Sequence, residues 1–293
     1  MKIAITANAE KPSALDLVRR AIDLIGDRAE VVLAEGVHLP IETPLRRAPL
    51  TDLTADAIVA IGGDGTYLST LQRTNVPLLA VNAGTVGVLA EVDASHVDAF
   101  DAAIDRLLDG HYYLEERMKL AAQVDGRPVP DAVNEFVLHS ARVGKMGRFD
   151  IAFDGHLVGR VQADGVIVAS PTGSTGYSLS SLGPIVDPGL DAIVVTTIAP
   201  FRVEARAVVV DPLRTVRLRP ADSGPAAVVI ADGQAEHPLA LKGSVTIYRS
   251  PRRAVLVRFG SRFFQRLRGK RILPWSEEFV DEEPHGAHLP PAP

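Results

Sequence analysis

The stretch DAIVAIGGDGTYLSTLQR, residues 56–73, contains the pattern that decides the fold. Its apolar residues 58–61 lead directly into the glycine-rich run GGDGT, residues 62–66, and apolar residues at helical spacing follow. A buried strand, a glycine turn and a helix in this order predict one unit of a parallel α/β sheet. Glycine lets the backbone approach a ligand closely, and the first N–H groups of a helix bind anions such as phosphate.

The GGDGT turn differs from the two best-known phosphate-binding turns. It lacks the Lys-Ser/Thr ending of a P-loop, and it does not have the G-x-G-x-x-G spacing of a dinucleotide-binding fingerprint. Its unusual element is Asp64, because a carboxylate beside phosphates is unfavourable unless it accepts a proton or holds Mg²⁺. The structural alternative is a tight turn in which Asp64 is the N-cap of the helix.

The first third of the chain extends the α/β pattern. The strand-like segments KIAITAN, EVVLAEG and PLLAVN alternate with helix-like segments at residues 13–26 and 96–110. This alternation predicts an N-terminal α/β domain, residues 1–112, with a parallel, Rossmann-like sheet.

From residue 113 onward the pattern changes to short β-branched segments separated by turn residues such as DG, DP and SG. These segments predict an all-β domain, residues 113–258, folded as a β-sandwich. Residues 259–275 regain helical character, and we expect this helix to pack back on the N-terminal domain. Residues 276–293 are acidic and then rich in proline, which predicts a disordered tail.

A hydroxyl-rich loop at residues 170–178, SPTGSTGYS, follows the apolar strand 165–169. Every residue of this loop except Pro171 is Ser, Thr, Gly or Tyr. Such a composition suits hydrogen bonding to a ligand with many hydroxyl and amide groups, and Tyr177 can stack on a ring. The alternative is a flexible serine linker, which the flanking apolar strand and the embedded Pro and Tyr disfavour.

Composition limits the classes of function. The 293 residues are 46% hydrophobic, enough for a substantial core, and contain no cysteine, which excludes disulfides and thiolate metal sites. The sequence has no apolar run of about 18 residues that would predict a membrane span. A net charge of -5 gives no basic field for nucleic acid. We therefore expect a cytoplasmic protein that binds neither a membrane nor nucleic acid, and we interpret the basic segment 252–271 as a solvated helix face, paired with acidic residues of another subunit.

Five motifs together resemble the NAD kinase family. In family order they are GGDGT at 62–66, VNAGTVGVLAEVD at 81–93, AVNEFVLHS at 132–140, ADGVIVASPTGSTGYSLSSLGPIVDP at 163–188 and ADGQ at 231–234. The GGDGT turn is shared with lipid kinases and phosphofructokinases, whereas the Asn-Glu pair and the TGST-x-YSLS loop are much more specific. The stretches RVGKM and VDPGLDAIVVTTIAPF resemble the archaeal-style branch of the family.

The resemblance implies an active site between the α/β domain and the β-sandwich, in which ATP phosphorylates the 2′-hydroxyl of the adenosine ribose of NAD. Asp64 would be the base for that hydroxyl, and Mg²⁺ would arrive with ATP. The residues implied to face the ATP phosphates are Gly62, Gly63, Gly65 and Thr66. The other residues implied to bind the substrates are Asn82, Asn134, Glu135, Lys145, Asp164, Thr172, Thr175, Gly176, Tyr177, Ser178, Leu179, Ser180 and Gln234. The family also implies a homo-oligomer, a dimer or a tetramer.

The sequence departs from the family pattern at a few positions. Gly176 replaces the usual Ala, Ala163 the usual Gly, and Val88 the usual Phe, while Ala-Pro-Phe at 199–201 replaces a Pro-His-Ser stretch, so no histidine is expected to act there. Two other functions remain open: another GGDGT-type kinase for a lipid or small molecule, and a dinucleotide-binding sensor without catalytic activity.

Overall fold

The computed structural model describes residues 1–37, 45–84, 87–142, 144–202, 205–221, 226–260, 263–269 and 272–273. The chain divides into two units, residues 1–260 and 261–293. In the second unit the structure describes one short helix, α5 (Phe263–Gly269). The tail predicted at 276–293 lies outside the described residues.

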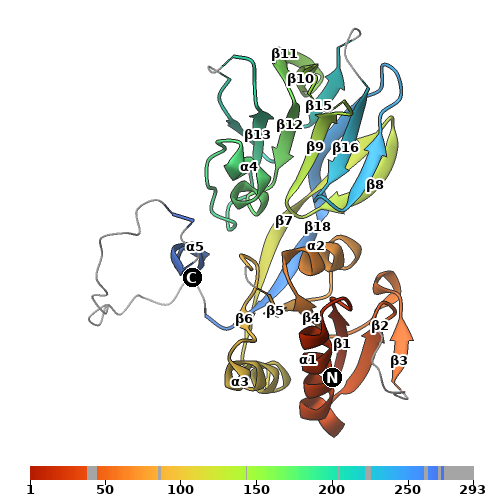
Figure 1. The fold of residues 1–293 in the computed structure, drawn as a ribbon, viewed down its shortest axis with the longest axis vertical. Coiled ribbons are helices and arrows are strands. Elements are labelled where there is room, and N and C mark those ends of the chain that lie inside the picture. The colour runs from red at the N-terminus through yellow and green to blue at the C-terminus, as the bar shows by residue number, and fades with distance from the viewer. Residues whose placement is uncertain are drawn as a thin grey trace, which may run out of the picture. The chain divides into compact units, whose positions relative to one another are not determined.

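The first unit begins with an α/β part, β1 to α3 (Figure 1). Its strands lie in the order β5-β4-β1-β2-β3, all parallel. Their bounds are β1 (Lys2–Ala7), β2 (Glu30–Ala34), β3 (Arg46–Ala48), β4 (Ala57–Gly62) and β5 (Leu78–Asn82), with β6 (Val92–Asp93) beside β5. The helical segments are α1 (Pro12–Ile25), η1 (Gly26–Arg28), η2 (Leu50–Asp52), α2 (Asp64–Arg73) and α3 (Val97–Leu108).

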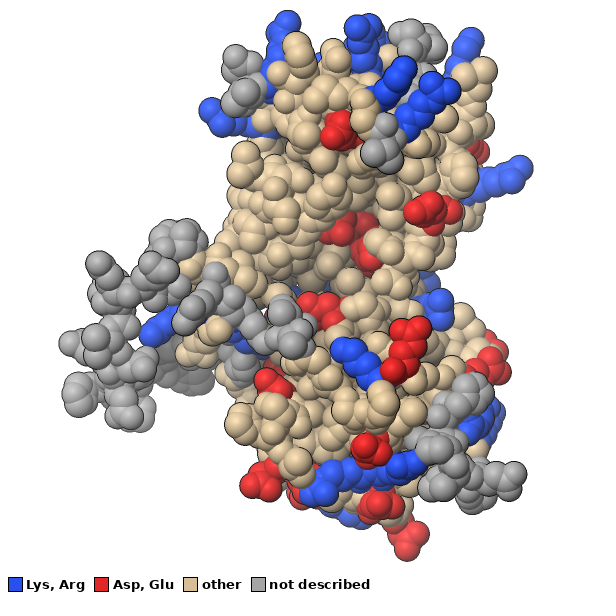
Figure 2. All heavy atoms as spheres, in the orientation of Figure 1, with Lys and Arg blue, Asp and Glu red and all other residues tan. Residues whose placement is uncertain are grey.

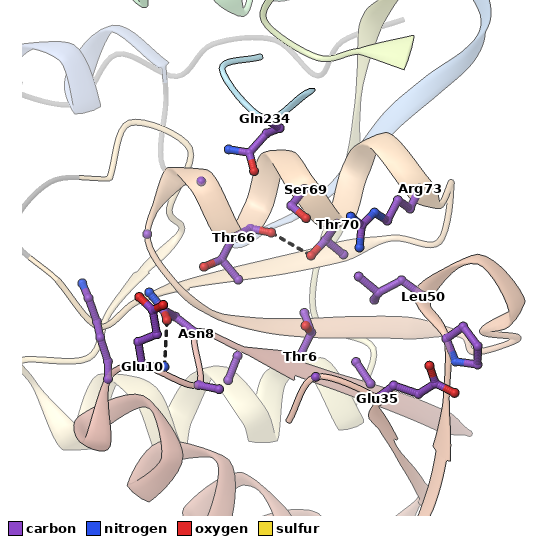
Figure 3. A pocket seen from close by; sticks show the side chains of 18 of the residues that line it. Thr6, Asn8, Glu10, Glu35, Leu50, Thr66, Ser69, Thr70, Arg73 and Gln234 are labelled. Carbon is purple, nitrogen blue, oxygen red and sulfur yellow. Dashed lines mark hydrogen bonds between the residues drawn. The ribbon is translucent and has the colours of Figure 1, made fainter. Parts of the chain in front are cut away.

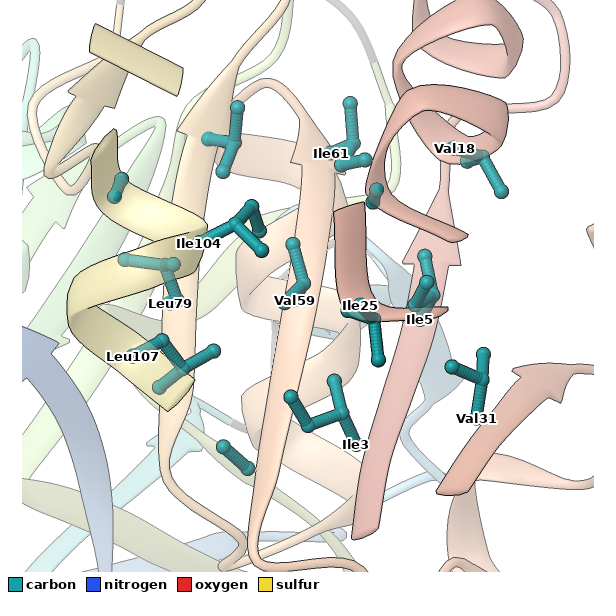
Figure 4. Close-up of a cluster of buried hydrophobic side chains, with 14 of the residues drawn as sticks. Ile3, Ile5, Val18, Ile25, Val31, Val59, Ile61, Leu79, Ile104 and Leu107 are labelled. Atoms are coloured by element: carbon teal, nitrogen blue, oxygen red, sulfur yellow. The ribbon is translucent and has the colours of Figure 1, made fainter. Parts of the chain in front are cut away.

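The central strands of the α/β part are buried on both faces. Alternate residues, including Ile3, Val59 and Leu79, pack with α1 and α3 (Figure 4). The residues between them, such as Ala60 and Ala80, pack with the apolar side of α2. Because helices cover both faces, β4 is apolar throughout rather than alternating, as is usual in parallel sheets.

The β part, β7 to β18, is a sandwich of antiparallel strands. One face belongs to a six-stranded sheet in the order β14-β13-β12-β9-β16-β17. Its strands are β9 (Glu135–Ser140), β12 (Gly165–Ala169), β13 (Ile193–Ile198), β14 (Val208–Val210), β16 (Ala227–Ala231) and β17 (Ala235–Pro238). The facing strands are β7 (Tyr113–Val124), β8 (Arg127–Ala132), β10 (Gly147–Phe153), β11 (His156–Ala163), β15 (Val216–Pro220) and β18 (Val245–Arg258).

A single apolar core fills the space between the two faces of the β part. It combines Phe136 and Val166 of the six-stranded sheet with Leu120, Leu218 and Ile247 of the other sheet. The predicted fold class, a parallel α/β part followed by a β-sandwich, is confirmed.

The strand β18 joins the two parts of the first unit. It pairs with β7 over residues 245–249 and 253–258, with a register shift between Arg249 and Arg253, and near its end Leu256 pairs in parallel with Leu78 of β5. One twelve-stranded sheet therefore runs through both the α/β part and the β part.

The interpretation of residues 252–271 as one solvated helix face is wrong for its first half. Arg252, Arg253 and Arg258 lie in the strand β18. Their ion-pair partners are Asp131, Asp191 and Glu91 of the same chain. The first half of the segment, up to Arg258, is therefore a strand and not a helix.

Basic side chains gather at the end of the β part formed by β10, β11 and β15 (Figure 2). In these strands, Arg160 and Arg219 share the buried carboxylate of Asp150.

Over the described ranges, no helix is both long enough and apolar enough to cross a membrane.

Candidate active site

The GGDGT turn connects β4 to α2 as the sequence predicts. Gly62 ends the strand, Gly63 is the N-cap with φ −130°, and Asp64 is the first residue of the helix. The alternative that Asp64 is the N-cap is therefore wrong. A Cβ at Gly62 would overlap the hydroxyl of Thr66, so the turn requires glycine at that position.

Asp64 is partly buried and is held by the loop that follows β5. One carboxylate oxygen accepts the N–H of Val88 at 3.1 Å, and the other accepts the N–H of Leu89 at 3.4 Å. Both donors are backbone groups, so they orient the carboxylate without adding a further side chain to the site.

Asn82 shapes the same loop from within. Its side chain is 3% exposed, its amide Nδ2 donates to the carbonyl of Gly84 at 2.8 Å, and its Oδ1 accepts the N–H of Gly84 at 3.1 Å. Both polar atoms of the Asn82 side chain, which was predicted to bind a substrate, are therefore hydrogen-bonded to the loop.

A pocket of about 800 Å³ opens beside the glycine turn (Figure 3). Its walls are the carboxyl ends of β1 and β2, the exposed side of α2, and Gln234 above the helix. The polar lining side chains are Thr6, Asn8, Glu10, Lys11, Glu35, Thr51, Thr66, Ser69, Thr70, Arg73 and Gln234. Ligand sites commonly lie at this edge of a parallel sheet.

Two basic residues of this pocket, Lys11 and Arg73, were not predicted from the sequence. Lys11 precedes α1, and its Nζ lies 2.8 Å from the place where a Cβ at Gly84 would be. Arg73 is the last residue of α2. The signal for Lys11 was available, because the loop after β1 must meet the loop after β4 at the carboxyl edge of a parallel sheet.

Asn134 and Glu135 lie against the hydroxyl-rich loop. The N–H of Ser170 donates to the carbonyl of Asn134 at 2.8 Å, and a Cβ at Gly173 would overlap that carbonyl. A Cβ at Gly176 would lie 3.4 Å from Oε2 of Glu135. The structure therefore brings the Asn-Glu pair and the loop into one cluster.

Glu135 is 7% exposed, and burial together with the nearby carboxylate of Asp232 raises its pKa to about 8. Among the described residues, its Oε2 has no hydrogen-bond partner, and neither has the buried hydroxyl of Thr172. Buried polar atoms are normally hydrogen-bonded, so two such atoms in one cluster indicate a ligand that completes them.

Asp232 joins this cluster to α2, although the sequence analysis assigned a role only to Gln234 of the ADGQ motif. Its carboxylate accepts the N–H groups of Val133, Asn134 and Glu135 at 2.8, 2.8 and 3.0 Å, and Nε2 of Gln72 at 2.9 Å. Burial raises the pKa of Asp232, and the four hydrogen bonds act against that rise.

Gln234, from the same turn, reaches the glycine turn. Its Nε2 lies 3.7 Å from the place where a Cβ at Gly65 would be. The turn 231–234 therefore lies against both the Asn-Glu cluster and the N-terminal end of α2.

The remaining predicted residues of the loop differ in exposure. Tyr177 is 42% exposed and Ser180 is also exposed, while Leu179 is partly buried. The hydroxyl of Thr175 donates to the carbonyl of Thr172 at 3.1 Å. The hydroxyl of Ser178 is fully buried and bonds to the hydroxyl of Thr196 at 3.0 Å, so it supports the loop from inside.

Asp164 and Lys145 are not brought into either cluster. Asp164 precedes β12, at the opposite end of that strand from the loop, where its carbonyl accepts the N–H of Ser140. Lys145 is exposed in the connection between β9 and β10.

An acidic residue held in a glycine-rich turn between strand and helix, in a fold that combines an α/β part with a β part and a hydroxyl-rich second loop, defines the class of GGDGT-type kinases. Two family models match the chain: the ATP-NAD kinase N-terminal domain at residues 42–112 and the ATP-NAD kinase C-terminal domain at residues 133–259. The chain belongs to the NAD kinase family.

Relatives and solved structures agree with the family. The NAD kinase of Methanothermobacter thermautotrophicus is 35% identical over 278 residues, covering 93% of this chain and 96% of the relative. That of Methanopyrus kandleri is 43% identical over 223 residues, covering 75% and 78%. The predicted resemblance to the NAD kinase family, including archaeal members, is confirmed.

The crystal structure of an Archaeoglobus fulgidus NAD kinase in complex with ATP is 28% identical, covers 92% of this chain and 99% of its own, and has a TM-score of 0.75. A yeast NADH kinase complexed with NADH has a TM-score of 0.81 at 24% identity, covering 96% and 89%, and shares the fold.

Proposed function

We propose that the protein is an NAD kinase, which transfers the terminal phosphoryl group of ATP to the 2′-hydroxyl of the adenosine ribose of NAD and so forms NADP. The observation that carries this proposal is the placement of Asp64. It lies at the start of α2, beside the 800 Å³ pocket, and the turn 231–234 places Gln234 near that end of the helix and Asp232 against the Asn-Glu cluster. The relatives and solved structures named NAD kinase support the same activity.

The pocket beside the glycine turn would hold ATP. The first turn of α2 lines this pocket, and its N–H groups would bind the phosphates, because a helix N-terminus favours negative charge. Lys11 and Arg73 add positive charge along the pocket. Phosphoryl transfer depends mainly on such positioning and charge stabilisation.

The Asn-Glu cluster would hold NAD. Asn134 offers both an amide donor and an acceptor, and Tyr177 offers an exposed ring for stacking. Glu135, with a pKa of about 8, is mostly protonated near neutral pH, so it can donate one hydrogen bond to a hydroxyl oxygen and accept another.

Asp64 would accept the proton of the 2′-hydroxyl as the oxygen attacks the terminal phosphorus of ATP. The N–H groups of Val88 and Leu89 hold its carboxylate in one orientation. A base in this position typically contributes about 10²–10⁴-fold to the rate.

Mg²⁺ bound to ATP would neutralise the phosphate charge during transfer. Within the described ranges, no group of three or more His, Asp or Glu side chains is arranged to hold a metal ion. An ion that the ATP phosphates carry would need no such group, and Glu10 and Glu35 are the carboxylates among the residues that line the pocket.

Replacing Asp64 with Asn tests the proposal. We expect NADP formation from NAD, ATP and Mg²⁺ to fall at least about 100-fold in kcat while NAD binding changes little, because the amide keeps the shape but cannot accept the proton. Asp98→Asn, at an exposed residue in the first turn of α3, is the matched control. An Asp64→Asn enzyme with near-normal kcat would refute the role of the base, and a wild-type chain that binds NAD tightly without forming NADP would be a sensor.

We also propose that the protein acts in the cytoplasm as a homo-oligomer, a dimer or a tetramer. The placement of Asp164 and Lys145 supports this assembly, because one chain does not bring them to the Asn-Glu cluster, whereas a second subunit can. Light scattering gives the oligomeric state, and a loss of NAD affinity in Asp164→Ala without a change in that state would support a shared site.

We further propose a division into domains. Residues 1–112 would form the domain that binds ATP, residues 113–258 would form the domain that binds NAD, and residues 259–275 would pack back on the α/β part. Crosslinking of cysteines introduced into α5 and the α/β part tests the last of these.

A further inference from the structure

Leu89 connects Asp64 to a buried group of charges on the other side of the loop. Its N–H donates to Oδ1 of Asp64 at 3.4 Å, and its carbonyl accepts Nη1 of Arg258 at 3.0 Å. Leu89 is 3% exposed and Arg258 is fully buried. One peptide segment therefore lies between the guanidinium of Arg258 and the carboxylate of Asp64.

Arg258 is itself fixed by two carboxylates from different parts of the chain. Its Nε donates to Glu115 of β7 at 2.5 Å, and its Nη1 donates to Glu91, which follows the loop, at 3.1 Å. The second oxygen of Glu91 accepts the N–H of Phe259 at 2.8 Å. Arg117 donates to both oxygens of Glu115 from the other side.

The Glu115 carboxylate of this cluster is ionised near neutral pH. Burial alone would raise the pKa of Glu115, but Arg117 and Arg258 beside it hold that pKa below its ordinary value. Arginine stays protonated in proteins. The planar guanidinium thus directs fixed donors at two carboxylates and one backbone carbonyl at the same time.

Stability alone is a weak reason for such a cluster. Buried ion pairs often contribute no more to folding than well-packed apolar side chains of the same size, because desolvation offsets the attraction. A rigid arrangement of charges does, however, hold a loop in one conformation. The loop held here is the one whose N–H groups orient Asp64.

We propose that Arg258 is a positioning residue for phosphoryl transfer: it fixes the carbonyl of Leu89 and thereby the two backbone N–H groups that aim the Asp64 carboxylate. This inference rests on the proposed function in one respect, since it takes Asp64 as the base. It adds a residue of β18, far from Asp64 in the sequence, to the machinery that sets the rate.

The variant Arg258→Lys tests the inference in the full chain. Lysine keeps the charge but lacks the planar set of donors, so the loop loses its fixed conformation while the cluster stays neutralised. We expect kcat for NADP formation to fall at least about tenfold, because small displacements of a reacting group cost that much or more. The dissociation constants of NAD and ATP, and the number of NAD sites per chain measured by calorimetry, should remain within about twofold.

The matched control is Arg253→Lys, in the same strand. Arg253 also pairs with one carboxylate through two donors, at 2.6 Å each to Asp191, but it contacts neither the loop nor Asp64 in the described structure. We expect its kcat to stay within about twofold of wild type. If Arg258→Lys does not fold, Glu91→Gln replaces it, because the amide keeps an acceptor for Phe259 while removing one charge from Arg258.

A second measurement separates positioning from a general loss of structure. In an Asp64→Asn background, assayed with enzyme in excess, Arg258→Lys should change the remaining rate by less than about threefold, because the group that it aims is already inactive. Two losses that multiply would overturn the inference. So would an Arg258→Lys enzyme with wild-type kcat, or a fall in kcat matched by an equal loss of NAD sites. A wild-type chain that forms no NADP refutes the proposed function instead.

Discussion

Glu135 lies in the most enclosed part of the Asn-Glu cluster, and its protonation depends on the fold. Its ordinary pKa is 4.5, whereas burial and Asp232 raise it to about 8 in the folded chain. Below pH 4.5 both the folded and the unfolded chain hold this proton. As the pH rises toward 8, the unfolded chain releases the proton first, so the contribution of Glu135 to stability is lost over this range.

The variant Glu135→Gln removes that titration. We expect the unfolding free energy of the wild type to fall, relative to the variant, by more than about 1 kcal/mol between pH of about 5 and about 8. Urea denaturation of both proteins at several pH values measures the difference. A constant difference across this range would show that Glu135 is not titrating there.

Asp232 gives a second prediction for a single residue. Each carboxylate oxygen of Asp232 accepts two hydrogen bonds. Asp232→Asn replaces one of these oxygens with an NH₂ group, which cannot accept them, so we expect the variant to destabilise the fold by at least about 2 kcal/mol. Asp154→Asn is the control, because Asp154 also has a positive φ, of 50° against 47° for Asp232, but lies in an exposed turn. Chemical denaturation of both variants checks this, and equal losses would contradict it.

Some of the residue-scale site could be predicted from sequence and some could not. The roles of Asp64 and the glycines can be predicted from the local sequence pattern, because a carboxylate in an anion-binding turn is unusual. Asp232 and Arg258 act through partners far away in the sequence, so only the folded chain shows what they hold. Ser178 shows the converse, since its hydroxyl suggests binding until the fold buries it.

At the scale of elements, α2 is held at both ends. Its first residue, Asp64, is bound by the loop after β5, and Gln72 near its end donates to Asp232. The buried Nζ of Lys119 donates to the carbonyl of Leu71 at 2.8 Å, which satisfies part of the helix C-terminus. The helix that carries the proposed base is thereby tied to the β part.

The hydroxyl-rich loop gives a prediction at this scale. In Gly173→Ala the added Cβ overlaps the backbone of Asn134, so the loop must move away from the Asn-Glu pair. We expect NAD affinity to fall at least about tenfold, because the free energy that overpacking typically costs corresponds to a change in affinity of this size. The affinity for ATP should stay unchanged. Calorimetric titration with each nucleotide measures both affinities.

Gly159→Ala is the control for this substitution, since a Cβ there meets no atom within 4 Å and the residue lies in β11. Equal losses in the two variants, or a loss of ATP affinity in Gly173→Ala, would contradict the role of the loop.

Strand, turn and helix over 56–73 follow from the local periodicity of apolar residues, and so do the β-branched segments after residue 113. The partner of each strand does not. No local pattern indicates that the end of β18 joins β5, because pairing depends on which sheet edge remains open after the other elements have packed.

At the scale of the whole first unit, the shared sheet predicts cooperative unfolding. A mixed apolar cluster joins Leu78 and Tyr67 of the α/β part to Val133, which lies between β8 and β9, and to Leu256 of β18. We expect the amides of β7 and β18 to exchange with deuterium last and at one common rate, and those of the short edge strand β3 to exchange early. Mass spectrometry of exchanged fragments measures this, and separate unfolding of residues 1–112 before any exchange in β18 would contradict it.

The pairing of Leu256 with Leu78 also bears on how the chain is made. Ribosomes release a protein from its N-terminus, so β5 leaves the exit tunnel long before the strand that will lie beside it. During that interval an apolar strand has an uncovered edge, and nascent chains with such edges are prone to associate with one another. The protein is therefore expected to depend on chaperone cover until the strand that pairs with β5 has been synthesised.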